Sequence, residues 1–431
     1  MRIDNIQIKN YKKFENISID FNSRMNVIIG NNGTGKTSIL DALSIGIGSI
    51  FLGIDTNSSP GIKKEDVRCV SKKIGSTIDR QPQFPVEILC RGNLNKIGDT
   101  WTRICSNESE FGKDIMRDGI KMLNESILLL HNIRQGDENT VLPVLAYYGT
   151  GRLWIQKSKK TSTIIDNRLQ GYTNCLSSEI DEKMMLKWFE KMTYIELQNG
   201  NPVPELQAVK KAIEESYVES GADVKNVNVK FDVSKERLEV EYEDTNGCFD
   251  SHPFYELSDG YRNTLSLIAD VAYRMAILNP QFLGNVTKKT PGIVLIDEVD
   301  LHLHPIWQKR ILKTLKNVFP LVQFIVTTHS PSIISSAKAD ELLILDGDSC
   351  RNFEYEVYGK DSNSVLTEIM ETSERPDEVT DKFVEFDNLM DKGDYKSAEN
   401  ILNVLRDILG ENDNGVISAS IALDFQKDWD E

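Results

Sequence analysis

A glycine-rich segment near the N-terminus has the residue types and spacing of a phosphate-binding loop. Residues Gly30–Thr37 read GNNGTGKT and match the pattern G-x-x-x-x-G-K-[ST]. The glycines allow backbone N–H groups to approach phosphate oxygens, and a helix that begins there adds positive potential. We expect Lys36 to reach the β- and γ-phosphates of ATP and the Thr37 hydroxyl to bind Mg²⁺. The other residues expected to contact the nucleotide are Gly30, Asn31, Asn32, Gly33, Thr34, Gly35 and Ser38.

Two carboxylates follow a strongly apolar segment further along the chain. Residues Gly292–Asp300 read GIVLIDEVD, which predicts a buried strand with acidic residues at its end. Phosphate sites in α/β folds open at the carboxyl ends of strands. We therefore expect Asp297 to bind Mg²⁺ and Glu298 to act as general base toward the attacking water. The alternative is an ordinary strand end followed by polar residues.

Three shorter motifs are informative only together. Ser258 and Gly260 in ELSDGYRN begin a predicted helix, a geometry that caps helices and can also bind anions. His302 and His304 in DLHLHP have a spacing that indicates packing more often than a metal pair. His329 ends a predicted strand in VTTHSP and would, alone, be a structural histidine.

The segments around these motifs predict strands and helices that alternate along the chain. Residues 3–11 and 14–21 alternate apolar and polar side chains, and the apolar run 25–30 leads into the glycine-rich loop. Residues 224–233 and 237–244 predict a hairpin. The expected helices cover residues 36–50, 113–131, 178–197, 203–220, 260–278, 305–318, 377–392, 395–409 and 416–429. This alternation predicts an α/β fold.

The order of the motifs resembles that of the ABC-type ATPase heads of the SMC/RecF class. The phosphate loop is followed by an insertion of about 220 residues, then LSDG, IDEVD, HLHP and THS. The opening run IxxIxIKNYKKF is also typical of that class. The segments LAYYGTGRLW, ELSDGYRN and GKDSNSVLTEIM further resemble the ATPase subunits of Septu-type antiphage systems, which are also found beside some retrons. The resemblance covers about residues 1–355.

The resemblance implies roles for residues that the local pattern leaves open. Ser258 and Gly260 would contact the γ-phosphate bound to the opposite subunit, so a homodimer or higher homo-oligomer is implied. His329 would be the switch histidine that senses the γ-phosphate. Lys12 falls where the class often has an arginine near the nucleotide. The signature reads LSDGY rather than LSGGQ, and Val299 replaces a common proline; both departures concern the rate of hydrolysis more than ATP binding.

We expect an ABC-type P-loop ATPase head with an inserted α/β lobe and an acidic helical C-terminal region. The N-terminal ATPase lobe would span residues 1–155 and the inserted helical and hairpin region 156–250. The C-terminal ATPase lobe, with the signature and both carboxylates, would span 251–355. Residues 356–431 would form an acidic helical tail for oligomerisation or partner docking.

Charge is distributed unevenly along the 431 residues. The net charge is −16, and the segment from Asp361 onward carries 19 acidic and 6 basic residues. An acidic chain is a poor general binder of nucleic acid, so we expect any DNA contact to go through the nearly neutral body, with 157–160 as its basic loop. No apolar run is long enough for a membrane span or a signal peptide, and the six cysteines are scattered. These features predict a cytoplasmic protein with no membrane contact.

The leading functional hypothesis is an ATP-binding and slowly hydrolysing regulatory subunit that controls a separate effector. The resemblance implies antiphage defence and an HNH-type nuclease as the partner. The insertion is too short for a long coiled coil, and the tail is too short for an appended Toprim nuclease. One alternative is a RecF-like DNA-repair ATPase that clamps on DNA. Another is a self-contained nuclease that uses Asp346 and Asp348 in LLILDGDS, where an ordinary strand and turn is the simpler interpretation.

Overall fold

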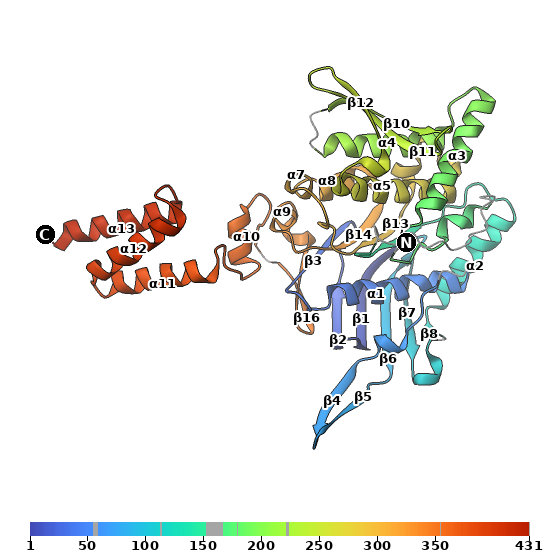
Figure 1. The fold of residues 1–431 in the computed structure, drawn as a ribbon. Coiled ribbons are helices and arrows are strands. Elements are labelled where there is room, and N and C mark those ends of the chain that lie inside the picture. Colours follow the sequence, from blue (N-terminus) through green and yellow to red (C-terminus); the bar gives the residue numbers. More distant parts are fainter. Residues whose placement is uncertain are drawn as a thin grey trace. The chain divides into compact units, whose positions relative to one another are not determined.

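Two compact units make up the chain in the computed structural model, Met1–Lys360 and Asp361–Glu431. The structure describes residues 1–54, 59–112, 114–151, 167–178, 180–220, 224–353 and 355–430, with side chains up to residue 426. Figure 1 shows the course of the chain. The finer division into four regions that the sequence suggests stays a prediction.

A six-stranded sheet forms the centre of the first unit, in the order β16-β15-β3-β14-β13-β9. Five strands are parallel and β16 joins the edge antiparallel to β15. Its strands are β3 (Met25–Ile29), β9 (Val144–Tyr148), β13 (Gly292–Ile296), β14 (Val322–Thr327), β15 (Leu342–Asp346) and β16 (Ser349–Asn352). Every residue of β3, β9, β13 and β14 is buried, which explains why these strands read as unbroken apolar runs. The α/β P-loop fold predicted from the sequence is confirmed.

A five-stranded antiparallel sheet, in the order β2-β1-β6-β7-β8, packs on helix α1 (Lys36–Ile47). Its strands are β1 (Arg2–Tyr11), β2 (Phe14–Asp20), β6 (Val86–Leu94), β7 (Ile97–Cys105) and β8 (Ile115–Asp118). The contact is close, because the indole N–H of Trp101 donates to the Gly46 carbonyl at 2.9 Å and a Cβ on Gly46 would lie 2.4 Å from the Cys90 sulfur. This sheet therefore fixes the helix that follows the glycine-rich loop.

The first unit also contains helices and an exposed hairpin. The helices are α2 (Ile120–Arg134), α3 (Glu182–Asn199), α4 (Pro204–Glu219), α5 (Asp259–Leu278), α6 (Val286–Lys289), α7 (Pro305–Gln308), α8 (Ile311–Val318) and α9 (Pro331–Ile334). A separate hairpin, β4 (Cys69–Ile74) and β5 (Thr77–Pro82), projects from the five-stranded sheet (Figure 1).

Three of the helices expected from the sequence differ in the structure. Residues 113–131 do not form one helix, since β8 precedes α2 and the two are separated at Asp118 (φ 59°) and Gly119 (φ 71°). Left-handed backbone of this kind cannot continue a helix. The helix expected over 305–318 is broken into α7 and α8. The helix expected over 36–50 ends at Ile47 and continues as a 3₁₀ segment, Gly48–Leu52.

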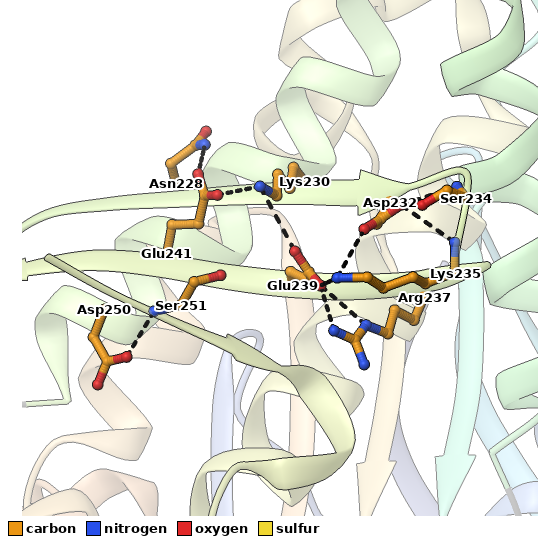
Figure 2. Close-up of polar contacts among 10 residues, drawn as sticks. All are labelled: Asn228, Lys230, Asp232, Ser234, Lys235, Arg237, Glu239, Glu241, Asp250 and Ser251. Atoms are coloured by element: carbon orange, nitrogen blue, oxygen red, sulfur yellow. Dashed lines mark hydrogen bonds and ion pairs between the residues drawn. The ribbon is translucent and has the colours of Figure 1, made fainter.

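A small antiparallel sheet of β10 (Val224–Asp232), β11 (Arg237–Asp244) and β12 (Phe249–Pro253) packs on α4. Its inner face is apolar, with Val229 and Val240 fully buried. Its outer face is charged, as Figure 2 shows, and its centre is Glu239, whose side chain is 7% exposed. Arg237, Lys230 and Lys235 place nitrogens 2.7, 3.6 and 3.5 Å from that carboxylate. The carboxylate is therefore compensated by three cations from the same hairpin.

The second unit is helical, with α10 (Ser362–Glu368), α11 (Asp377–Asp391), α12 (Tyr395–Leu409) and α13 (Asn414–Asp430). It has a core of its own, in which Phe386, Leu402 and Leu405 are at most 2% exposed. Arg375 ties the segment before α11 to Asp413 before α13, at 2.9 Å. No helix in the part of the chain that the structure describes is long and apolar enough to cross a membrane.

Candidate functional site

The glycine-rich loop joins the carboxyl end of β3 to the N-terminus of α1. Gly30, Gly33 and Gly35 have φ values of 153°, 76° and 101°, which side chains other than glycine rarely adopt. Space forbids a side chain as well, because a Cβ would lie 2.5 Å from the Leu345 carbonyl oxygen at Gly30 and 2.5 Å from the Phe14 ring at Gly35. Backbone shape and close packing together therefore require glycines here.

Lys36 turns back over the loop that precedes it. Its Nζ donates to the Gly30 carbonyl at 2.8 Å and to the Asn31 carbonyl at 3.1 Å. Burial lowers the pKa of Lys36, and the charges of Asp297, Glu298 and Asp300 act in the opposite direction. Two carbonyl groups thus hold the ammonium group within the loop. A negatively charged phosphate could take their place as acceptor.

Asp297 lies at the centre of a hydroxyl–carboxylate–hydroxyl arrangement. Thr37 Oγ1 donates to Asp297 Oδ2 at 2.8 Å, and Thr327 Oγ1 donates to Asp297 Oδ1 at 2.6 Å. Asp297 is 1% exposed. Carboxylate and hydroxyl oxygens are the ligands that Mg²⁺ prefers, and Mg²⁺ usually takes few protein ligands beside water and phosphate. These residues fit such an ion, although the described residues contain no cluster of three or more acidic, histidine or cysteine ligands.

Glu298 and His329 lie at the rim of the same region. Glu298 has a left-handed φ of 45°, and its backbone N–H donates to Thr327 Oγ1 at 2.7 Å. Burial, followed by the charge of Lys36, lowers the pKa of His329. The imidazole is therefore more easily neutral than usual, and a neutral ring can donate one hydrogen bond while accepting another.

A cavity of about 380 Å³ collects most of the residues that the sequence singles out. It is lined by Lys12, Lys13, Asn32, Gly33, Gly35, Lys36, Thr37, Ser38, Asp297, Glu298 and His329. The other predicted loop residues shape the loop itself, because Thr34 donates to the Asn31 carbonyl through its N–H at 3.2 Å and its hydroxyl at 2.8 Å. The lysine ammonium and the helix N-terminus make this cavity suitable for a polyphosphate.

Four residues of this region were not identified from the sequence. Lys13 lines the cavity and donates to the Gly33 carbonyl at 3.0 Å. Asp41 pairs with Lys12 and accepts a hydrogen bond from the Tyr147 hydroxyl at 2.8 Å. Thr327 holds Asp297. Lys13 could have been found from the doubled lysine in NYKKF, and Thr327 from its place before His329, but the link between Asp41 and Tyr147 depends on tertiary structure.

Ser258 and Gly260 lie elsewhere, at the N-terminus of α5. They line a second cavity of about 720 Å³ together with Tyr261, His302, His304 and Trp307, and none of them lines the first cavity. Gly260 packs against the His302 carbonyl, which would be 2.6 Å from a Cβ. His304 accepts a hydrogen bond from the Ile306 N–H and caps α7, in agreement with a packing role for this histidine.

A buried ion pair fixes α5, the helix that begins at Ser258, on the central sheet. Arg274 Nε lies 2.7 Å from Asp270 Oδ2, and both side chains are at most 2% exposed. The same carboxylate oxygen accepts the Tyr148 hydroxyl of β9 at 2.6 Å. Arg274 also donates to the carbonyls of Gly171 and Thr173, at 3.0 and 2.9 Å. The network joins α5, β9 and the segment 168–173.

One further predicted pair of residues can be placed in the structure, and one predicted loop cannot. Asp346 and Asp348 lie at the exposed turn between β15 and β16, where Gly347 has a φ of 56°. The strand-and-turn interpretation of LLILDGDS describes this geometry. The basic loop 157–160 lies outside the described residues.

Comparison with known proteins gives the following relationships. A family model described as an AAA domain matches residues 5–220, and a second AAA domain model matches residues 195–335. The chain is 26% identical to the "Retron Ec83 probable ATPase" of Escherichia coli, over 99% of this chain and 89% of that protein. It is 26% identical to the "Septu protein PtuA" of Bacillus mycoides, over 80% of this chain and 40% of that protein. A solved Smc head bound to the C-winged helix domain of ScpA is 15% identical, covers 83% of this chain and has a TM-score of 0.48. The resemblance to Septu ATPases predicted from the motifs is confirmed.

Proposed function

Because this chain belongs to the AAA domain family, we propose that it binds ATP and Mg²⁺ around Gly30–Thr37 and hydrolyses ATP slowly. The observation that carries this proposal is the hydrogen bond between Thr37 and Asp297. It brings the phosphate-binding loop and the acidic strand end into one cavity, as ATP hydrolysis requires.

Each residue would contribute one function. Lys36 would exchange its two carbonyl partners for the β- and γ-phosphates. Thr37 and Asp297 would hold Mg²⁺, which when bound neutralises charge that develops on the phosphates. Glu298 would accept a proton from the attacking water, and His329 would donate a hydrogen bond to the γ-phosphate.

The two cavities support a dimer. Ser258 and Gly260 lie in a cavity whose lining shares no residue with that of the loop. A signature that contacts ATP would therefore act on the nucleotide of a second copy. Two copies at least would be needed for a complete site.

We propose that the biological role is control of a separate nuclease, of the HNH type, in antiphage defence. The support is the similarity to the retron ATPase and to Septu protein PtuA. The described residues around Asp346 and Asp348 form an exposed turn rather than a cavity, so a separate effector is the simpler arrangement.

The test is a pull-down from the native host with the Glu298→Gln variant, ATP and Mg²⁺, read by mass spectrometry. Loss of the general base should hold the protein in its ATP-bound state. A stoichiometric nuclease in the eluate supports the regulatory role. An eluate with DNA and repair proteins but no nuclease would contradict it and favour a DNA-clamping ATPase. Lys36→Ala is the control that should not capture an ATP-dependent partner.

A further inference from the structure

Two adjacent lysines, Lys12 and Lys13, line the loop cavity, but their partners differ. We propose that Lys13, rather than Lys12, is the second lysine beside Lys36 that contacts the triphosphate. In this proposal Lys12 is a structural residue that holds the wall of the cavity. The inference rests on the proposed ATP binding and names the residues that recognise the phosphates.

Lys12 is already paired with carboxylates. Its Nζ contacts Asp41 and lies 3.7 Å from Asp66 Oδ1. These two carboxylates are fixed in turn, because Tyr147 donates to Asp41 at 2.8 Å and Tyr11 to Asp66 at 3.3 Å. A lysine with two carboxylate neighbours belongs to a group of net negative charge, which offers little attraction to a phosphate.

Movement of Lys12 toward a phosphate would also leave charges uncompensated. The Asp66 side chain is 9% exposed and that of Asp41 is 27% exposed. When the cation leaves carboxylates that are partly removed from water, the folded state becomes less stable. The backbone adds a constraint, since Lys12 has a left-handed φ of 48° and its N–H donates to the Asp66 carbonyl at 2.6 Å.

Lys13 has the opposite environment. Within the described residues its Nζ has no carboxylate partner and donates only to the Gly33 carbonyl at 3.0 Å, beside the Phe14 ring at 5.8 Å. This is the pattern of Lys36, whose Nζ also rests on loop carbonyls. A phosphate oxygen is a stronger acceptor than a carbonyl, so both ammonium groups would gain by the exchange.

The stem of Lys13 packs against the loop at Gly35, although the residue is exposed. A Cβ on Gly35 would lie 2.9 Å from Lys13 Cδ and 2.5 Å from the Phe14 ring. The side chain therefore runs along the loop and carries its ammonium group to the cavity. Lys13 and Lys36 together place two positive charges beside the loop. The charge of Lys12 is instead offset by the carboxylates of Asp41 and Asp66.

The experiment compares Lys13→Ala, Lys13→Arg and Lys12→Ala with the wild type and Lys36→Ala. The probes are the fluorescent analogues mant-ATP and mant-AMP with Mg²⁺, and thermal unfolding is measured for each variant. Lys13→Ala should weaken mant-ATP binding about tenfold, which corresponds to one charge-assisted hydrogen bond. It should change mant-AMP binding less than about twofold and leave the melting temperature unchanged, and Lys13→Arg should restore most of the affinity.

Lys12→Ala should instead lower the melting temperature by about 2–4 °C, because Asp41 and Asp66 lose their cation. Its preference for mant-ATP over mant-AMP should stay near that of the wild type. The inference is overturned if Lys12→Ala reduces that preference more than Lys13→Ala does, or if Lys13→Ala binds mant-ATP as tightly as the wild type. A wild type that binds no mant-ATP, or a Lys36→Ala variant that binds equally well, would overturn the proposed function itself.

Discussion

Thr37 donates a hydrogen bond to Asp297 at 2.8 Å, although the two residues are 260 positions apart in the sequence. The bond joins the first turn of α1 to the end of β13. Thr327 completes the arrangement from β14, so three segments converge on one buried carboxylate. The position of Asp297 depends on the central sheet, which brings the ends of β3, β13 and β14 side by side.

This relationship predicts the effect of Asp297→Asn on magnesium. The amide removes the negative charge and should raise the Mg²⁺ concentration needed for tight mant-ATP binding by about tenfold or more. A titration of Mg²⁺ at fixed nucleotide measures this change. Asp346→Asn, in the exposed turn after β15, is the matched control and should titrate like the wild type. Equal titrations for Asp297→Asn and the control would exclude Asp297 as a magnesium ligand.

The charged face in Figure 2 predicts a pH-dependent stability. The hydrogen bond from Arg237, followed by the charges of neighbouring lysines, lowers the pKa of Glu239 below its ordinary value of 4.5. A lowered pKa stabilises the folded state at pH values above the ordinary pKa of 4.5. This contribution is lost as the pH falls through the folded-state pKa. Glu239→Gln should therefore lower the melting temperature at pH 7 by about 2–4 °C.

The difference should become smaller as the pH falls below 4.5 and through the lowered folded-state pKa of Glu239, because protonation then removes the charge in the wild type as well. Glu236→Gln, at an exposed position in the same hairpin turn, should match the wild type across this pH range. A difference between Glu239→Gln and wild type that grows as the pH falls would contradict this assignment.

The buried pair of Asp270 and Arg274 predicts a non-additive double variant. Arg274→Met alone should cost about 3–5 kcal/mol in the free energy of unfolding, because it leaves a buried carboxylate without its cation. Asp270→Leu in the Arg274→Met background should recover a large part of that loss. Urea unfolding of the single and double variants measures both values. A double variant less stable than Arg274→Met would show that the ion pair is not the dominant interaction.

The separate core of the second unit predicts local effects of mutations there. Phe386 is 2% exposed in that core, and Phe386→Ala should cost the unit about 3–5 kcal/mol. Hydrogen exchange read by mass spectrometry should show faster exchange in α11–α13 and no change around Gly30–Thr37. Val384→Ala, on the same helix but 53% exposed, is the control and should leave exchange unaltered. Unchanged exchange in α11–α13 of Phe386→Ala would contradict a core built around this side chain.

Local sequence patterns predicted those helices and strands whose burial is visible in the spacing of their apolar residues. The helix Tyr395–Leu409 was predicted with the bounds that α12 has, because its buried residues recur at helical spacing. The buried strands β3, β13 and β14 were recognised because they read as short apolar runs before polar or glycine residues. The position of the cavity could be predicted as well, because the carboxyl ends of parallel strands meet at one edge of a sheet.

Other features have no local signal. The hairpin of β4 and β5 is exposed along nearly its whole length, so no alternation of apolar residues marks its strands. The break between β8 and α2 depends on two consecutive left-handed residues, Asp118 and Gly119, inside a run with helical composition. The different roles of Lys12 and Lys13 arise from Asp41, Asp66 and Tyr147, which approach from separate elements. Such contacts require the tertiary structure.

The role of Glu298 is tested most directly by steady-state ATP hydrolysis of the purified wild type and Glu298→Gln, with mant-ATP binding measured in parallel. The wild type should hydrolyse ATP slowly and only in the presence of Mg²⁺. Glu298→Gln should bind mant-ATP as tightly as the wild type but hydrolyse ATP at least about 100-fold more slowly, because the general base is lost. Equal rates of ATP loss for the two proteins would contradict a catalytic site at Glu298.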